Sequence, residues 1–399
     1  MAKTPRLAVL LLIYAAFVSI GLPDGILGAA WPQMRGELRL DLNENWPMLA
    51  LGSCGSGLSS FLSGIALRRL GVGRVLVLTT FLTGFVILGY AFGATFAIIT
   101  SLAFFLGLGN GAIDAGLNNF VASNLSSRHM NWLHGCWGVG ISLGTLLVSG
   151  VLAAGGTWRG AYRAVGLLQL GLALAFWWKR RSLPGVAARP ENEPPSEHPS
   201  YAATFRLPAA WASISAFFVY CGFECSAGLW IASVLHDGRG WAMETAGLMA
   251  TLYWASLTVG RFLIGTVSQR LAPIRIVRTA VIGAVLGTGL IALSSLPGVR
   301  ASAGGIVMAA GLLVTGLSLA PIFPMLMHDT PRCVGPGHAV NLIGFQGAGG
   351  QLGFTLLPIA IGTLLRLYST EWLGAMLAVL ALALLSTLVV RERYALPST

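Results

Sequence analysis

The chain has 399 residues, of which 55% are hydrophobic and only 10% are charged, against about 25% charged residues in a soluble domain. A soluble fold of this size needs a charged surface, so this composition excludes one and indicates a surface that faces lipid. The net charge of +11 does not indicate a nucleic-acid-binding protein either, because the Lys and Arg residues form short clusters between apolar runs.

Twelve apolar runs follow one another, each close to the roughly 20 residues that a membrane helix needs. They cover approximately 7–34, 45–67, 73–93, 95–123, 131–154, 160–179, 209–235, 243–268, 275–296, 300–327, 337–365 and 370–390. The stretch 181–206 is rich in Pro and charge and cannot bury a core, so it predicts a cytoplasmic linker. We therefore expect an all-α membrane protein with two pseudo-symmetric six-helix bundles, at residues 1–180 and 207–399.

An internal repeat supports this duplication. Several residues of the first half recur in the second half at one constant shift of 201 positions. The matching pairs are Phe17 and Phe218, Val18 and Val219, Gly21 and Gly222, Gly64 and Gly265, Arg69 and Arg270, Leu70 and Leu271, and Arg74 and Arg275. Repeats of this kind predict a substrate site near the membrane midplane, where the two halves meet.

The distribution of basic residues predicts the orientation. If the chain starts inside, 17 of its 25 Lys and Arg residues fall on the inner side and 7 on the outer side. This bias places both termini in the cytoplasm. We expect a monomeric multi-pass protein of the bacterial inner membrane, whose first apolar run is a retained helix and not a cleaved signal peptide.

Three of the 14 acidic residues lie deep in apolar runs: Asp24, Asp114 and Glu224. A lone carboxylate at the bilayer centre costs at least ~2.5–3.5 kcal/mol, so it normally faces a polar cavity and has a function. Pro23 and the glycines on either side of Pro23-Asp24 predict a helix break at Asp24, where a carboxylate can bind a proton or a polar ligand. The alternative is a capping acid near the outer water layer.

Asp114 belongs to a polar stripe. Asn110, Asp114 and Asn118 are spaced by four residues and therefore share one helical face. Such a stripe predicts a cavity lining, and the alternative is a network of hydrogen bonds between helices.

Glu224 lies within one residue of the repeat position of Asp24, so the equivalent helix of each half carries an acid. We expect it beside the substrate, with a structural pair to an Arg or a backbone group as the alternative. Arg261 is expected to extend to the cytoplasmic surface or to pair with a loop group.

Amide and aromatic side chains complete the predicted substrate site, since amides bind hydroxyls and rings cover the apolar face of a sugar. The members of this set are Asn110, Asn118, Asn131, His134, Trp137, Trp254, Asn341 and Gln346. Packing and aromatic belts are the alternative explanation for each of them. The chain has no zinc spacing, phosphate loop or nucleophile elbow, so we expect no enzyme.

With these motifs the chain resembles the fucose:proton symporter family of sugar permeases within the major facilitator fold. The resemblance rests on Asp24 ahead of Pro32-Gln33, on Asp114 four residues before Asn118-Asn119-Phe120, and on Asn131 at the start of the fifth helix. Two amides of the family's fifth helix are replaced here by His134 and Trp137. The resemblance implies that Asp24 and Asp114 are the proton and sugar sites.

The sequence thus predicts a secondary active transporter that couples a sugar or similar polyol to protons, with sodium left open as the coupling ion. Three acids are expected to take part in proton coupling, Asp114 as the main proton acceptor together with Asp24 and Glu224, and the last two are also expected near the substrate. No cofactor is expected beyond the ion gradient. A proton-coupled exporter of drugs or amphiphiles is the main alternative, and a membrane sensor or scaffold without transport is the other.

Overall fold

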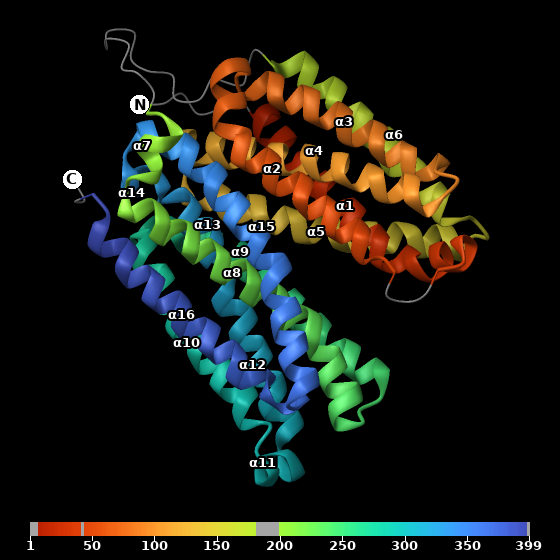
Figure 1. Ribbon diagram of the computed structural model, residues 1–399, viewed down its shortest axis with the longest axis vertical. Helices are drawn as coiled ribbons and strands as arrows, with labels where there is room; N and C mark the ends of the chain where they lie inside the picture. Colours follow the sequence, from red (N-terminus) through yellow and green to blue (C-terminus); the bar gives the residue numbers. More distant parts are fainter. Residues whose placement is uncertain (1–6, 41–43, 181–198, 397–399) are drawn as a thin grey trace. The chain divides into compact units, whose positions relative to one another are not determined.

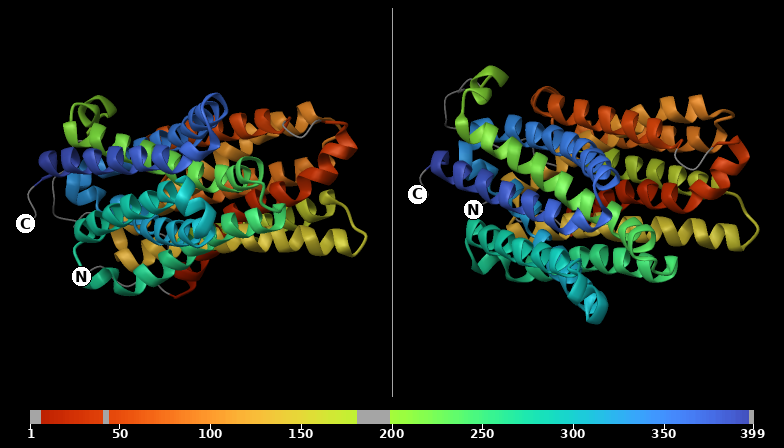
Figure 2. Two further views of the ribbon diagram at one scale, coloured as in Figure 1. Left: turned by 90° about the horizontal axis from the view of Figure 1, so that it is seen from below. Right: turned by 60° about the horizontal axis from the view of Figure 1, so that its bottom comes forward.

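The protein is built from α-helices joined by short turns (Figure 1). A computed structural model describes residues 7–40, 44–180 and 199–396, and these ranges contain no strand. Within them, twelve helical segments are long and apolar enough to cross a membrane. The predicted all-α membrane fold with twelve spanning helices is confirmed, and Figure 2 gives two further views of it.

The first half of the chain supplies six spanning helices, and all begin and end within a few residues of the predicted runs. They are α1 (Leu7–Leu38), α2 (Trp46–Leu70), α3 (Val72–Phe92), α4 (Phe96–Asn124), α5 (Ser127–Ala153) and α6 (Trp158–Lys179).

The second half supplies the other six spans, some of which consist of two helical segments. Its elements are α7 (Tyr201–Phe205), α8 (Pro208–Ser233), the π-helical turn η2 (Val234–Gly238), α9 (Met243–Val267), the 3-10 turn η3 (Ser268–Arg270), α10 (Pro273–Leu293), α11 (Pro297–Ser302), α12 (Gly304–Leu319), α13 (Ile322–His328), α14 (Thr330–Val334), α15 (Pro336–Leu367), the 3-10 turn η4 (Thr370–Trp372) and α16 (Leu373–Tyr394).

The chain separates into two compact units that follow the two halves, with two short segments exchanged. Unit 1 comprises residues 1–125, 132–199 and 336–348, and unit 2 comprises residues 126–131, 200–335 and 349–399. The start of α5 therefore belongs to unit 2, and the start of α15 belongs to unit 1. The predicted linker falls mostly at residues 181–198, which lie outside the described residues.

Close helix packing within unit 1 depends on small residues. α2 packs along α4, and α3 packs along α6. A Cβ atom added to Gly107 on α4 would collide with the backbone carbonyl of Gly52 on α2. Only glycine lets the two backbones approach this closely, as is common where membrane helices pack.

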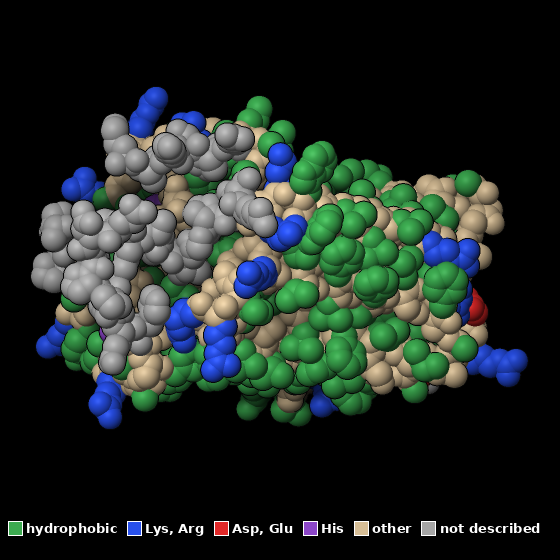
Figure 3. All heavy atoms as spheres, turned by 90° about the horizontal axis from the view of Figure 1, so that it is seen from above, with side chains coloured by type: hydrophobic (Ala, Val, Ile, Leu, Met, Phe, Trp, Pro, Cys, Tyr) green, Lys and Arg blue, Asp and Glu red, His purple; other side chains and the backbone are tan. Residues whose placement is uncertain are grey.

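The outer surface of the protein is largely hydrophobic, as the composition predicts. Figure 3 shows hydrophobic side chains spread over the middle of one face, with Lys and Arg side chains mainly toward its two ends. Exposed Leu78, Phe85 and Leu168 belong to α3 and α6. These side chains are exposed because lipid, not water, is the solvent for this surface.

Two local features differ from the expectations. α1 runs without interruption through Pro23, so the predicted break at Asp24 is absent; neighbouring groups in membrane proteins can satisfy the backbone that a proline leaves free. The predicted linker ends in a helix, because Ser200 caps α7 by accepting a hydrogen bond from the backbone N–H of Ala203 at 3.1 Å.

Candidate functional site

Asp24 lies in the middle of α1 and has a partner on α5. The indole Nε1 of Trp137 donates a hydrogen bond to Asp24 Oδ2 at 3.2 Å, and the Asp24 side chain remains accessible. Both residues belong to unit 1. The structure thus brings together two residues that the sequence predicted independently for the site.

Glycines bring α1 close enough to α5 for this contact. A Cβ atom added to Gly25, the residue after Asp24, would collide with the carbonyl of Ile141 on α5. The predicted use of this glycine was to loosen the helix. The structure instead indicates that Gly25 allows close approach of two backbones.

The stripe on α4 also points to α5. Asn118 is fully buried, and its Oδ1 lies 3.0 Å from Nε2 of His134. Asp114, one turn earlier on the same face, interacts with the Asn118 side chain. Phe17 on α1 contacts the His134 ring edge-on, with 5.2 Å between ring centroids. The hydrogen bond between helices, which was the alternative for this stripe, is therefore present.

His134 and Trp137 join these contacts into one set. They are three residues apart on α5, and therefore lie on one side of it, where Trp137 bonds to Asp24 and His134 to Asn118. We call Asp24, Asp114, Asn118, His134 and Trp137 the unit 1 polar cluster. It offers two carboxylates that can take up protons, together with amide, imidazole and indole groups that can bind hydroxyls. Asn110 extends the α4 stripe, and its buried Oδ1 has no hydrogen-bond partner within the described chain.

Asn131 lies apart from this cluster, in the segment of α5 that belongs to unit 2. Its side-chain amide donates to the carbonyl of Ser127 at 2.9 Å and lies 4.0 Å from the sulfur of Met325. Ser127 in turn contacts Ser268 of η3 at 3.1 Å. The structure therefore gives Asn131 packing partners, and its contact with substrate stays a prediction.

Glu224 on α8 forms an ion pair inside unit 2. Nη2 of Arg261 on α9 lies 3.0 Å from Glu224 Oε1, and both side chains are almost fully buried. The expectation that Arg261 extends to the surface or pairs with a loop group is wrong, because the Glu224 carboxylate neutralises the guanidinium where it is buried. The structural pair to an Arg, which was the alternative for Glu224, is present.

Aromatic residues surround this ion pair. The hydroxyl of Tyr253 donates to the backbone carbonyl of Glu224 at 3.0 Å. Trp254 packs against Tyr253 with 5.2 Å between ring centroids and lies close to Gly228 on α8. The structure thus places the predicted residue Trp254 beside the turn of α8 that follows Glu224.

Asn341 and Gln346 occupy the part of α15 that belongs to unit 1, and both are fully buried. Asn341 accepts a hydrogen bond from the Arg68 guanidinium and donates to the carbonyl of Pro199 at 2.9 Å. The neighbouring Phe345 stacks on Phe61 of α2. These contacts connect α15 to α2, and a substrate contact of Asn341 or Gln346 stays a prediction.

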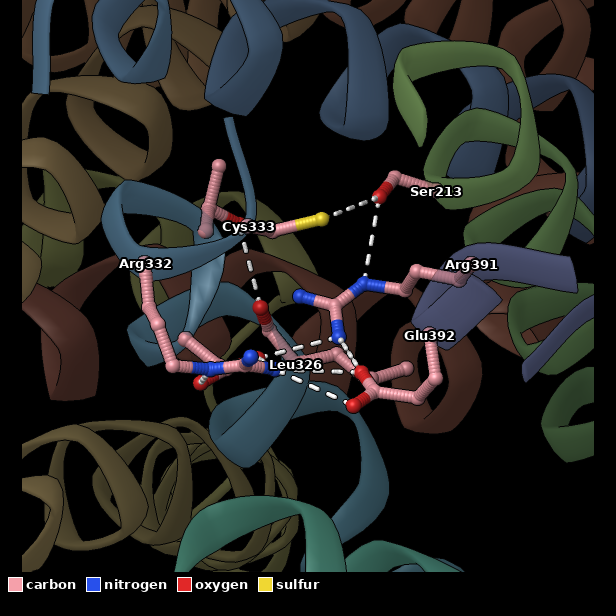
Figure 4. Close-up of polar contacts among 8 residues, drawn as sticks. Ser213, Leu326, Arg332, Cys333, Arg391 and Glu392 are labelled. Carbon is pink, nitrogen blue, oxygen red and sulfur yellow. Dashed lines mark hydrogen bonds and ion pairs between the residues drawn. The ribbon is translucent and has the colours of Figure 1, made fainter. Parts of the chain in front are cut away.

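One buried charge network in unit 2 escaped the sequence analysis (Figure 4). Arg391, near the end of α16, bonds to Asp329 Oδ2 at 3.0 Å, to Glu392 Oε1 at 2.9 Å and to Ser213 Oγ of α8 at 3.2 Å. Arg332 bonds to the same Asp329 at 2.6 Å and to Glu392 at 3.1 Å. In the sequence, the i, i+3 spacing of Asp329 and Arg332 is the signal that could have indicated this network.

A second overlooked group joins the ends of α1, α3 and α6. Glu37 pairs with Arg159 at 2.8 Å and accepts a hydrogen bond from the Trp158 indole at 2.6 Å. Arg159 also donates to the carbonyl of Gly93, just after α3, at 2.8 Å. Partial burial works to raise the pKa of the Glu37 carboxyl, but the hydrogen bonds from Arg159 and Trp158 outweigh it and leave the pKa below its ordinary value.

Unit 2 contains an equivalent group with the charges exchanged. Arg239, just after the span that α8 begins, pairs with Glu371 at 2.7 Å, directly before α16. The same guanidinium donates to Ser295 Oγ at 2.9 Å, just after α10. Each unit thus has an ion pair that joins the ends of three of its helices. The acid lies near the end of α1, beyond the Leu7–Leu27 span, in unit 1, and in η4 directly before α16 in unit 2. We call these two groups the end clamps.

Comparison with known proteins places the chain in a family. Residues 13–345 match the model of the Major Facilitator Superfamily. A curated relative, the hexuronate transporter of Bacillus subtilis (strain 168), is 25% identical over 288 residues. These residues span 67% of this chain and 66% of that protein, just under two thirds of its length.

Solved structures show the same fold. The crystal structure of the Major Facilitator Superfamily transporter FucP in the outward conformation aligns with a TM-score of 0.77 and 13% identity, over 97% of this chain and 99% of that one. A single-substitution variant of FucP, the Escherichia coli fucose:proton symporter, aligns with a TM-score of 0.74 and 12% identity, over 98% and 99% of the two chains. The matching family model and the shared twelve-span architecture agree with one another, and the chain belongs to the Major Facilitator Superfamily.

Proposed function

We propose that this protein is a secondary active transporter that carries a sugar or similar polyol together with protons, by alternating access. The observation that carries the proposal is the pair of carboxylates in the unit 1 polar cluster, Asp24 and Asp114. Within the described chain, neither forms an ion pair. A membrane carboxylate without a counter-charge must face water or bind a proton, and proton-coupled transporters use such groups.

The proposal gives the two acids different tasks. Asp114 is the main proton acceptor, since its neighbour Asn118 can hydrogen-bond to either charge state of the carboxyl group. Asn118 also contacts His134, whose imidazole can carry a proton. Asp24 binds substrate hydroxyls beside Trp137, whose ring can cover an apolar sugar face. The substrate and the proton can drive the change between the outward-facing and inward-facing states only if they bind these two states with different affinities.

Glu224 has a structural place in this proposal, because the buried Arg261 guanidinium matches its charge. The name of the hexuronate transporter relative favours sugar acids as a second substrate class. The proposed location is the bacterial inner membrane with both termini in the cytoplasm, which rests on the distribution of Lys and Arg.

The test is uptake by the purified full chain in proteoliposomes under an imposed inward proton gradient. The substrate panel contains labelled neutral hexoses, pentoses and hexuronates, with a sodium gradient as a separate arm. The proposal expects gradient-driven accumulation of at least one sugar and its loss in Asp114→Asn. The control is Asp237→Asn, which changes an exposed acid at the end of the α8 span. If no sugar enters and labelled hydrophobic cations are extruded instead, the exporter alternative replaces the proposal.

A further inference from the structure

A groove of about 620 Å³ opens on unit 2 between α7, the first turns of α8 and the last turns of α16. Figure 1 shows α7 at the same end of unit 2 as the last turns of α16. One candidate span begins at Pro208 and another ends at Tyr394, and both residues line the groove. The groove therefore lies at the boundary between the hydrocarbon layer and water.

The wall of the groove is aromatic and fixed in place. The indole N–H of Trp211 donates to the carbonyl of Phe205 at 2.8 Å, and the two rings lie 5.4 Å apart. Trp211 is nevertheless 54% exposed, and Tyr394 across the groove is 50% exposed. Trp and Tyr at this level of a membrane protein normally contact lipid at the headgroup boundary.

Two of the hydroxyl side chains that line the groove are bonded to their own helix. The hydroxyl of Ser386 donates to the carbonyl of Ala383 at 2.7 Å, and that of Thr387 donates to the carbonyl of Leu384 at 2.8 Å. Their polar atoms are thus satisfied by their own helix, which leaves carbon surface for a ligand. Among the described lining residues Arg206 is the one cation, it is exposed, and no acid accompanies it.

The buried network of Figure 4 connects α8 and α16, the two helices that form opposite walls of the groove. Val390 and Tyr394 line the groove, whereas Arg391 between them is buried and bonds to Ser213 of α8. Because this contact joins α8 to α16 directly beneath the groove, the binding surface exists before any ligand arrives. A preformed site avoids the cost of ordering its walls on binding.

We propose that this groove binds one anionic phospholipid. Its phosphate pairs with the Arg206 guanidinium, whose planar donors match phosphate oxygens, and an acyl chain lies along Trp211 and Val390. An anionic lipid is favoured over a zwitterionic one because the groove offers a cation for the phosphate but, among its described lining residues, no acid for a choline or ethanolamine group. This inference does not depend on what the protein transports.

The test is a lipid titration of the purified full chain in neutral detergent, followed by thermal unfolding, with phosphatidylglycerol and phosphatidylcholine as probes. Phosphatidylglycerol is expected to raise the unfolding temperature, and Arg206→Gln is expected to weaken its apparent affinity roughly fivefold, the effect of about one basic residue near an anionic lipid surface. The matched control is Arg393→Gln, an exposed arginine of α16 that does not line the groove. The apparent affinity of Arg393→Gln for phosphatidylglycerol should equal that of the unchanged chain.

The proposal is overturned if Arg206→Gln and Arg393→Gln respond alike, if the two lipids act equally, or if soluble glycerol phosphate alone gives the full shift. A second measurement locates the lipid. Phosphatidylglycerol with brominated acyl chains should quench the part of the tryptophan fluorescence that Trp211→Phe removes. Equal quenching in the unchanged chain and in Trp211→Phe would place the lipid elsewhere.

Discussion

The three membrane carboxylates differ in how their charge is compensated. Glu224 has a guanidinium 3.0 Å away. Within the described chain, Asp24 accepts a hydrogen bond from the Trp137 indole and Asp114 interacts with the Asn118 amide, and neither carboxylate forms an ion pair. A compensated carboxylate keeps its charge in a buried site, while an uncompensated one gains from water or a proton. This contrast separates a structural acid in unit 2 from two candidates for coupling in unit 1.

The contrast predicts the stability of Glu224 variants. Glu224→Gln leaves Arg261 buried without its counter-charge, and the free energy of unfolding should fall by about 3–5 kcal/mol. Removing both charges, in Glu224→Gln with Arg261→Met, should recover much of that loss. Thermal or chemical unfolding in detergent measures both, with Asp237→Asn as the exposed control. A double variant as unstable as Glu224→Gln alone would show that the ion pair is not the source of the loss.

Among the elements, α16 depends on one arginine for its connection to α8. Arg391 is 1% exposed and joins Ser213, Asp329 and Glu392 (Figure 4). Arg391→Met should therefore destabilise unit 2 by about 3–5 kcal/mol, because two acids lose a buried partner. The nearby exposed Arg393→Met should change stability by less than about 0.5 kcal/mol. Similar unfolding temperatures for the two variants would contradict the role given to this network.

The end clamps predict a pH dependence at the ends of the helices. The pKa of Glu37 lies below its ordinary value of 4.5, so its contribution to stability is complete above that value. The contribution is then lost as the pH falls through the lower pKa of the folded state. Unfolding temperatures measured from pH about 6 to about 3 should fall more steeply for the unchanged chain than for Glu37→Gln. Parallel curves would mean that the Arg159 pair is not formed in solution.

At the scale of the whole molecule, the sequence predicts the fold because the lipid environment imposes long apolar runs. Polar groups at membrane depth are rare, and the sequence therefore also singles out the residues that the structure brings together in the unit 1 polar cluster: Asp24, Asp114, Asn118, His134 and Trp137. It does not find the partner of Glu224, because Arg261 lies 37 positions away on another helix. Arg68 and Asn341 are 273 positions apart, and only the folded chain brings such pairs together.

The end clamps illustrate a further limit of the sequence repeat. Glu37 and Arg239 lie within one residue of equivalent positions at the shift of 201, yet their charges are opposite. A search for identical residues therefore misses them. The property that the two halves share is the ion pair that joins three helix ends, and it can be built with either sign of charge at either position.

The central claim is that proton movement is coupled to substrate movement through Asp114, and one measurement tests it most directly. Proteoliposomes without an imposed gradient would receive the substrate identified by the uptake panel, while a pH dye records proton entry. The account predicts that protons enter with the substrate in the unchanged chain. In Asp114→Asn, proton entry should vanish while exchange of labelled for unlabelled substrate continues. Substrate entry without proton entry in the unchanged chain, or undiminished proton entry in Asp114→Asn, would contradict it.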